Sequence, residues 1–125
     1  MSDIEIEGVV INGNALGRTI GFPTANMDIE GVVVVENGVY RSKIEIDGTT
    51  YDAMSNVGTR PSVDGSTRLL ETHVLNFNGN LYGRRLKLRL LEKIRDEVKF
   101  STIDALRQQL LCDREYVATQ ADKNR

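Results

Sequence analysis

The sequence predicts a mainly β protein in which a small antiparallel barrel packs against one C-terminal α-helix. Apolar and polar residues alternate in several short stretches, which is the period of a strand with one buried face. Asn-Gly and Asp-Gly pairs separate many of these stretches and favour tight hairpin turns. Helical spacing of apolar residues begins only near position 101. About six short strands followed by a single helix are typical of a small barrel.

Length and composition indicate one globular domain. The 125 residues are enough for one buried core and too few for two. A net charge of -2 gives no basic excess for general binding to nucleic acid or to an anionic membrane surface. No stretch approaches the roughly 18 apolar residues of a membrane span, and the acidic N-terminus does not resemble a signal peptide. Cys112 is the only cysteine, so we expect a packed or idle thiol in a cytoplasmic monomer.

The N-terminal part of the chain is predicted to be a strand, a glycine-rich loop and a second extended segment. Isoleucines alternate with acidic residues in the stretch 3–11, and the strand should end near Asn12. Residues 13–23 should form a loop, because Pro23 cannot donate to a β ladder. Residues 24–27 then return to an extended path, so the loop leads directly into a strand.

Turn signals divide the middle of the chain into further strands. The Asp47-Gly48 pair predicts a hairpin between two of them. Residues 58–67 are nearly all turn formers and are predicted to form a long loop. Glu71 should share one strand face with His73, Leu75 and Phe77. The predicted strands of this part are 32–35, 38–46, 51–57 and 69–77.

The last strand and the helix have the clearest patterns. Leucines alternate with basic residues over 85–90, so one face of this strand should be solvated. The Ser101 hydroxyl and the early Asp104 favour a helix start. We expect a single domain over 1–125 with its core at about 4–118 and a frayed tail at 119–125. The apolar stripe of the helix should consist of Ile103, Leu106, Leu110 and Val117.

The stretch 13–26 has the composition of a binding loop. Its glycines leave backbone amides free of side chains, and such amides can surround phosphate oxygens. Arg18 adds a positive group that can bind phosphate through two hydrogen bonds. The glycine spacing matches neither the P-loop nor the dinucleotide-binding pattern. A flexible loop without a ligand is the alternative interpretation.

Thr24 and Asn26 are candidate ligands of a cation. Residues two apart on an extended segment point the same way, so a hydroxyl and an amide oxygen could face one hard cation. Because neither ligand is charged, a Mg²⁺ ion held here would depend on substrate phosphates for its other ligands. An ordinary strand-end feature is the alternative.

Glu71 is the candidate general base. On a strand face shared with apolar residues its carboxylate would be partly desolvated, which suits proton abstraction. The alternative is a glutamate on the wet face of an edge strand. His73, the only histidine, is better explained as a packing or hydrogen-bonding residue than as a second base.

Six motifs resemble, in order and spacing, those of the riboflavin kinase family. The resemblance runs from about Gly8 to Asp113, and the specific combination is Pro-Thr-Ala-Asn after a glycine-rich loop with Glu-Thr-His in a later strand. The motifs are Gly-Arg-Thr-Ile-Gly-Phe-Pro-Thr-Ala-Asn (17–26), Asn-Gly-Val-Tyr (37–40), Ser-Asn-Val-Gly-Thr-Arg-Pro (55–61), Glu-Thr-His-Val-Leu-Asn-Phe (71–77), Leu-Tyr-Gly (81–83) and Ile-Arg-Asp-Glu-Val-Lys-Phe (94–100).

The resemblance implies a six-stranded antiparallel, Greek-key-like barrel with a C-terminal helix. It also implies transfer of the ATP γ-phosphate to the ribityl 5′-hydroxyl of riboflavin, giving FMN and ADP. Glu71 would receive the hydroxyl proton, and Thr24 and Asn26 would bind Mg²⁺ and ATP. Further ATP contacts are implied at Gly13, Gly17, Arg18, Val74, Asn76 and Tyr82. Flavin contacts are implied at Phe22, Arg95, Val98 and Phe100.

Two other classes of function are open on sequence alone. A non-catalytic flavin-binding barrel would not need Glu71, Thr24 and Asn26. A barrel that binds single-stranded nucleic acid would need a basic groove with stacked aromatic residues, whereas the chain has three Phe, four Tyr and a net negative charge. Bifunctional bacterial relatives carry an additional N-terminal adenylyltransferase domain that makes FAD. Nothing in this sequence corresponds to that domain, so we expect the reaction to stop at FMN.

Overall fold

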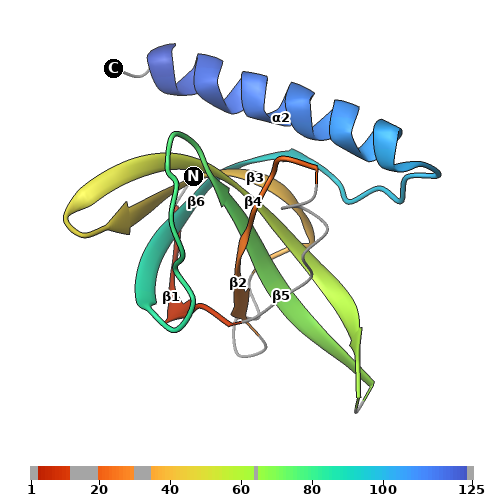
Figure 1. Ribbon diagram of the computed structural model, residues 1–125, viewed down its shortest axis with the longest axis horizontal. Coiled ribbons are helices and arrows are strands. Elements are labelled where there is room, and N and C mark those ends of the chain that lie inside the picture. Colours follow the sequence, from red (N-terminus) through yellow and green to blue (C-terminus); the bar gives the residue numbers. More distant parts are fainter. Residues whose placement is uncertain (1–2, 12–19, 30–34, 64, 124–125) are drawn as a thin grey trace.

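The computed structural model describes residues 3–11, 20–29, 35–63 and 65–123. Within them, six antiparallel strands curl into a nearly closed barrel, and a helix crosses the outside of the barrel (Figure 1). The predicted mainly β fold with a C-terminal helix is therefore confirmed. The elements are β1 (Ile4–Val9), β2 (Ala25–Asp28), β3 (Gly38–Ile46), β4 (Thr49–Ser62), β5 (Gly65–Val74), β6 (Arg85–Arg95) and α2 (Ile103–Lys123).

The order of the strands explains how the sheet closes. Neighbours follow the order β1-β6-β3-β4-β5-β2, so β1 and β2 lie at the two ends of the sheet. Ile11, just beyond β1, forms a bridge to Asn26 of β2, and its amide donates to the Asn26 carbonyl at 2.8 Å. The two ends of the sheet thus meet at Asn26.

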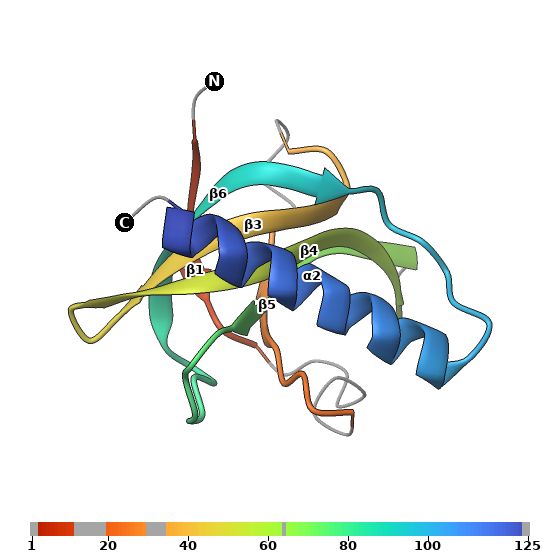
Figure 2. The same ribbon diagram turned by 90° about the horizontal axis from the view of Figure 1, so that it is seen from above.

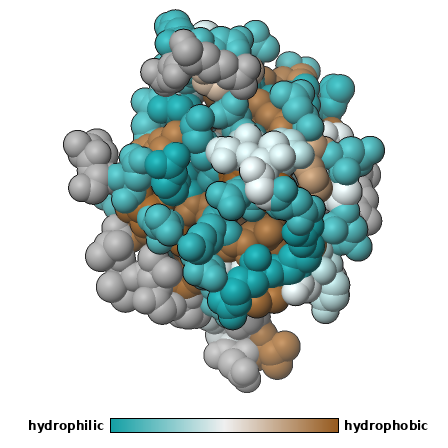
Figure 3. All heavy atoms as spheres, turned by 90° about the vertical axis from the view of Figure 1, so that its left-hand side faces the viewer, coloured by the Kyte–Doolittle hydropathy of each residue, from teal (hydrophilic) through white to brown (hydrophobic). Residues whose placement is uncertain are grey.

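The alternation predicted for β6 is confirmed. Leu86, Leu88 and Leu90 are at most 5% exposed and belong to the barrel core, whereas the basic residues between them are exposed. Arg89 pairs with Asp3 at 3.5 Å on the outer surface. Figure 3 shows one face of the molecule, where hydrophilic and hydrophobic side chains are intermixed. The outer face of β6 is therefore solvated while its inner face is packed.

Three hydroxyl groups are buried together inside the barrel. Ser42 Oγ lies 2.8 Å from Ser55 Oγ, which in turn lies 2.8 Å from Thr72 Oγ1. The three residues are at most 1% exposed and come from β3, β4 and β5. A buried hydroxyl without a partner destabilises a protein by about 1–3 kcal/mol. The chain of hydroxyls therefore favours the one register of these strands that keeps all three paired.

The helix α2 packs on the outer face of the barrel, chiefly over β4 (Figure 2). A second cluster of buried residues fills this contact, with Phe22, Met54, Leu75 and Val117 at its centre. The helix begins where Thr102 Oγ1 accepts a hydrogen bond from the Ala105 amide at 3.0 Å. No helix in the part of the chain that the structure describes is long and apolar enough to cross a membrane.

The prediction of a long loop at 58–67 is wrong. β4 continues to Ser62 and β5 already begins at Gly65, so the two strands form a long hairpin paired from Ala53 opposite Val74 to Ser62 opposite Gly65. Gly65, with a φ of 128°, supplies the unusual backbone conformation that the turn needs. Backbone pairing with a neighbouring strand outweighs the turn propensity of these residues.

The strand predicted at 69–77 begins earlier and ends earlier than expected. β5 ends at Val74, because Asn76 adopts a left-handed conformation with a φ of 59°, which a strand cannot contain. Phe77 consequently leaves the predicted alternation and packs beside Tyr51 against the barrel core, with ring centroids 5.3 Å apart. The strand predicted at 32–35 falls largely outside the described residues.

The helix also differs from the prediction at both ends. Thr102 caps it in place of Ser101, and Ile103, expected on the apolar stripe, is 56% exposed. The helix continues to Lys123, and Ala121 is buried, so the predicted fraying after position 118 is absent from the described residues up to 123. Cys112 is exposed rather than packed. The buried positions of the helix are Asp113, Val117 and Ala121.

Replacing the middle hydroxyl of the buried chain should destabilise the barrel. Ser55→Ala removes the shared partner of Ser42 and Thr72, and we expect the free energy of unfolding to fall by about 1–3 kcal/mol. Urea denaturation measures the change. Ser66→Ala, an exposed serine of β5, is the matched control. Equal stability of the two variants would contradict a structural role for the hydroxyl chain.

Candidate functional site

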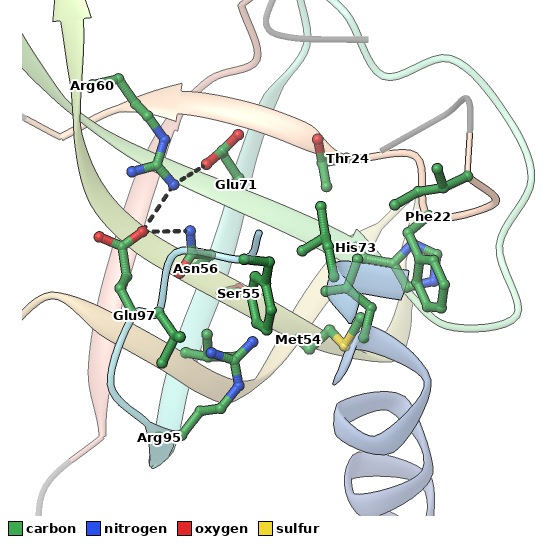
Figure 4. Close-up of a pocket in the computed structure, with 16 residues that line it drawn as sticks. Phe22, Thr24, Met54, Ser55, Asn56, Arg60, Glu71, His73, Arg95 and Glu97 are labelled. Carbon is green, nitrogen blue, oxygen red and sulfur yellow. Dashed lines mark hydrogen bonds and ion pairs between the residues drawn. The ribbon is translucent and has the colours of Figure 1, made fainter. Parts of the chain in front are cut away.

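A cavity of about 290 Å³ lies between the outer face of the barrel, the segment 96–102 and the start of α2 (Figure 4). Its volume is close to the lower limit of about 300 Å³ for small-molecule sites. Apolar and polar residues line different parts of it. The apolar ones are Ile20, Phe22, Val39, Met54, Val98, Phe100, Leu106 and Leu110, and the polar ones are Thr24, Ser55, Asn56, Arg60, Glu71, His73, Arg95 and Glu97.

Glu71 is held in a network of charged side chains at the polar part of the cavity. Arg60 donates from Nη2 to Glu71 Oε1 at 2.8 Å and to Glu97 Oε2 at 2.9 Å. Asn56 Nδ2 donates to the same Glu97 oxygen at 2.9 Å. Burial lowers the pKa of Arg60, but the hydrogen bond to Glu97 and the charge of Glu71 outweigh it and raise the pKa overall. The guanidinium therefore stays charged between the two carboxylates.

Gly58 leaves the room that this network needs. A Cβ atom at this position would overlap the Arg60 Nη1 and Glu97 Oε2 atoms. Any larger residue would push the guanidinium or the carboxylate aside. The glycine in the stretch 55–61 is thus explained by the close approach of side chains and not by a turn.

His73 is a buried hydrogen-bonding residue, as the sequence suggested. Its Nδ1 lies 2.9 Å from the Pro23 carbonyl, its ring centroid lies 5.1 Å from that of Phe22, and it is 9% exposed. Burial lowers its pKa, the hydrogen bond to Pro23 raises it, and the positive charge of Arg114 lowers it, with a net lowering. The ring is therefore neutral at neutral pH, and Nδ1 donates to the carbonyl.

Arg95 connects the end of β6 to the helix. Its Nη2 lies 2.8 Å from Asp113 Oδ2 and its Nε lies 3.1 Å from Asp113 Oδ1. Asp113 is 2% exposed and also accepts from Gln109 Nε2 at 3.0 Å. The guanidinium carbon lies 5.9 Å from the centre of the Phe100 ring. This ion pair fixes α2 and the segment before it beside the cavity.

Asn26 has the features of a cation ligand. It is 4% exposed, and its Oδ1 is buried with no hydrogen-bond partner among the described residues. It pairs with Glu71 across β2 and β5, and Thr24, two residues earlier, lines the cavity. No three His, Cys, Asp or Glu side chains gather into a metal site in the described ranges. A buried amide oxygen with no partner among the described residues fits a Mg²⁺ ion that takes its other ligands from phosphates.

Comparison with known protein families matches residues 1–121 to riboflavin kinase. The chain belongs to the riboflavin kinase family. The bifunctional riboflavin kinase/FMN adenylyltransferase of Haemophilus influenzae is 42% identical over 111 residues, which are 88% of this chain and 36% of that protein. The chain thus spans about a third of the length of this curated relative. The resemblance of the six motifs is therefore confirmed at the level of the family.

Two solved structures resemble the fold. A riboflavin kinase from Trypanosoma brucei has a TM-score of 0.70 at 22% identity and covers 98% of this chain and 82% of its own. A Streptococcus pneumoniae protein described as a macrolide-efflux protein has a TM-score of 0.84 at 36% identity, covering 94% of this chain and 39% of its own. Because the second match covers a minor part of that protein, its described activity does not carry over to this chain.

The structure brings most of the predicted site residues to two neighbouring cavities. Those expected at the flavin line the first cavity together with Glu71 and Thr24. Val74 and Asn76, expected near the adenine, line a second cavity of about 530 Å³. Among the described residues only His73 lines both cavities, so it forms part of the wall between them. The residues expected at the flavin, all of which line the first cavity, are Phe22, Arg95, Val98 and Phe100.

Five predicted nucleotide contacts are not placed at either cavity. Asn26 lines neither of them, although it pairs with Glu71 across β2 and β5. Tyr82 is 57% exposed and lines neither cavity of the described part of the chain. Gly13, Gly17 and Arg18 lie outside the described residues. All five assignments stay predictions.

Sequence reasoning missed Arg60, Glu97 and Asp113. Arg60 and Glu97 lie within quoted motifs, but nothing in the spacing shows that residues 37 positions apart share a hydrogen bond. Asp113 offered a usable signal, because an acidic residue on the buried side of an amphipathic helix needs a partner. Its partner Arg95 was assigned to the flavin instead.

Removing the charge of Asp113 should destabilise the protein, because it leaves Arg95 without its partner in a largely buried position. We expect Asp113→Asn to lower the free energy of unfolding by about 3 kcal/mol, the low end for a broken buried pair, since the Arg95 side chain is 19% exposed. Urea denaturation measures this. Glu115→Gln, at an exposed position of the same helix, should change stability little. Similar losses in both variants would contradict the anchoring role.

The buried His73 should make stability depend on pH. Its folded-state pKa is lowered from the ordinary value of 6.5, so below this pH the unfolded chain binds a proton that the folded chain does not. Stability should therefore fall as the pH drops through 6.5 toward the folded-state pKa. His73→Gln should weaken this dependence below pH 6.5, as measured by thermal unfolding. The same slope in variant and wild type would refute the assignment.

Proposed function

We propose that this chain transfers the γ-phosphate of ATP to the 5′-hydroxyl of riboflavin, giving FMN and ADP. One observation carries the proposal: Glu71 and Thr24 line the same cavity as the four residues assigned to the flavin. The second cavity, which shares His73 with the first, is lined by Val74 and Asn76, and we assign it to the nucleotide. Membership of the riboflavin kinase family supports the same reaction.

Glu71 acts in this proposal as the general base. Its carboxylate accepts the proton of the 5′-hydroxyl as the oxygen attacks the γ-phosphorus. Phosphoryl transfer asks a protein mainly to position two substrates and to offset charge, and a base on a rigid strand meets the first need. The backbone at Glu71 is held on both sides, because β5 pairs with β2 along one edge and with β4 along the other.

Thr24 and Asn26 would hold Mg²⁺ through a hydroxyl and an amide oxygen, with the nucleotide phosphates completing its ligands. When bound, the ion would supply positive charge against the phosphate oxygens. The structural feature that supports this assignment is Asn26 Oδ1, which is buried and has no hydrogen-bond partner in the described part of the chain.

The apolar part of the first cavity would take the isoalloxazine ring. Phe22 lies on one side of the cavity, and Val98 and Phe100 come from the segment before α2. Arg95, fixed by Asp113, keeps this segment in place. Apolar side chains here would also limit the access of water, which competes as acceptor of the phosphoryl group.

Several attributes stay predictions. The chain is expected to be monomeric and cytoplasmic, to bind neither nucleic acid nor membranes, and to stop at FMN. A non-catalytic flavin-binding role is not favoured, since such a module would not need a carboxylate and a cation ligand side by side.

Neutralising the base should abolish turnover without abolishing flavin binding. We expect Glu71→Gln to lower kcat by about 10²–10⁴-fold, the contribution typical of a general base. Mass analysis of products after incubation with riboflavin and MgATP separates FMN, FAD and no reaction, and quenching of riboflavin fluorescence follows binding. Glu45→Gln, an exposed glutamate of β3, is the control. Unchanged turnover in Glu71→Gln would refute the assigned base.

Removing the cation ligands should affect the nucleotide more than the flavin. We expect Asn26→Ala and Thr24→Ala to raise the KM for MgATP by about tenfold, because each loses one ligand of the ion. Raising the Mg²⁺ concentration should restore part of the activity. Titration of both substrates against both variants measures the difference. Equal losses for ATP and riboflavin would count against a cation role.

A further inference from the structure

Arg60 is placed to control the candidate base directly. It lies on β4 next to β5, and its side chain is 33% exposed at the polar part of the cavity. Figure 4 shows its guanidinium between the carboxylates of Glu71 and Glu97. Both contacts use the same nitrogen, Nη2, which carries two N–H donors, one for each carboxylate.

The contact to Glu71 fixes how that carboxylate is turned. Arg60 occupies Oε1 at 2.8 Å, and among the contacts of the described residues Oε2 is not used. A carboxylate held by one oxygen presents the other in a defined direction. The free oxygen Oε2 is the one that can accept the proton of a substrate hydroxyl.

Glu97 in turn holds Arg60 in place. Glu97 Oε2 accepts from both Arg60 and Asn56, so the guanidinium is tied to β4 and to the segment 96–102. Gly58 leaves space for both groups to lie against the strand. Arg60 Nη1 also donates to the Thr59 carbonyl at 3.2 Å. These contacts hold the guanidinium beside Glu71.

We propose that Arg60 is a positioning residue that orients Glu71 toward the acceptor hydroxyl, with Glu97 as its anchor. The inference rests on the proposed phosphoryl transfer. Because Glu97 belongs to the same segment as Val98 and Phe100, the wall of the flavin cavity and the direction of the base are mechanically joined through Arg60.

A different role for the same arginine predicts different kinetics. If Arg60 bound a phosphate of ATP, its loss would raise the KM for ATP and would lower turnover independently of Glu71. If it acted only through Glu71, its loss would lower kcat, leave both KM values nearly unchanged and matter little once Glu71 is replaced. The two roles are therefore separable by one set of variants.

The first experiment compares single variants of the full chain. Arg60→Met should lower kcat for riboflavin by about 10- to 100-fold, the cost of a misplaced catalytic group, with KM changes below about threefold. Arg60→Lys should recover part of this loss, because an ammonium can donate to Glu71 but lacks the planar fork that serves both carboxylates. Arg89→Met, a surface arginine of β6 paired with Asp3, is the matched control.

The second experiment is a double-mutant cycle with Glu71→Gln. We expect Arg60→Met to lower kcat by less than about twofold in the Glu71→Gln background, because the effects of groups that act through one another are not additive. Thermal unfolding of each variant identifies an assay temperature at which all of them are folded. Should Arg60→Met fail to fold, Arg60→Lys carries the same cycle.

The outcomes separate the two levels of inference. Absence of FMN from the wild-type chain would overturn the proposed function and this role together. FMN from the wild type with unchanged kcat in Arg60→Met would overturn only the role of Arg60. So would additive losses in the cycle, or a main effect on the KM for ATP. A loss of kcat that lysine partly rescues, and that disappears with Glu71, supports the positioning role.

Discussion

Pairing of β5 on both of its edges is the constraint on which the site depends. β2 lies on one side of this strand and β4 on the other, and the registers place Asn26 and Asn56 opposite Glu71. A slip of β5 by one residue would turn Glu71 to the opposite face of the sheet from Asn26 and Asn56. The buried hydroxyls of Ser55 and Thr72, which face the interior, oppose such a slip from inside the barrel.

The ion pair of Arg95 and Asp113 fixes the helix α2 relative to the barrel. It joins the end of β6 to the middle of α2, so the segment between them crosses the cavity between two fixed points. Glu97 and Phe100 both lie in that segment. A buried pair gives little net stability, because desolvation offsets attraction, but its geometry selects one docking position for the helix.

The sequence predicted the elements whose signals are local. The strand at 38–46 coincides with β3, and the leucines of β6 alternate inward as expected, because side-chain period and hairpin residues act within a few positions. The extension of the β4–β5 hairpin through 58–67 was missed because backbone pairing between the two neighbouring strands outweighs the turn propensity of their residues. The partners of Glu71 and Arg95 were missed for a related reason: Arg60 and Asp113 come close only after folding.

The position of the cavities follows from the small size of the barrel. Inward side chains from all six strands, from Ile6 on β1 to Leu90 on β6, fill its interior, as expected for a closed barrel of few strands. A ligand therefore has to bind on the outer face, where strands alone give a flat surface. The helix and the segment 96–102 supply the missing wall. Losing the anchor at Asp113 would thus open the site while leaving the barrel, and Glu71 on it, in place.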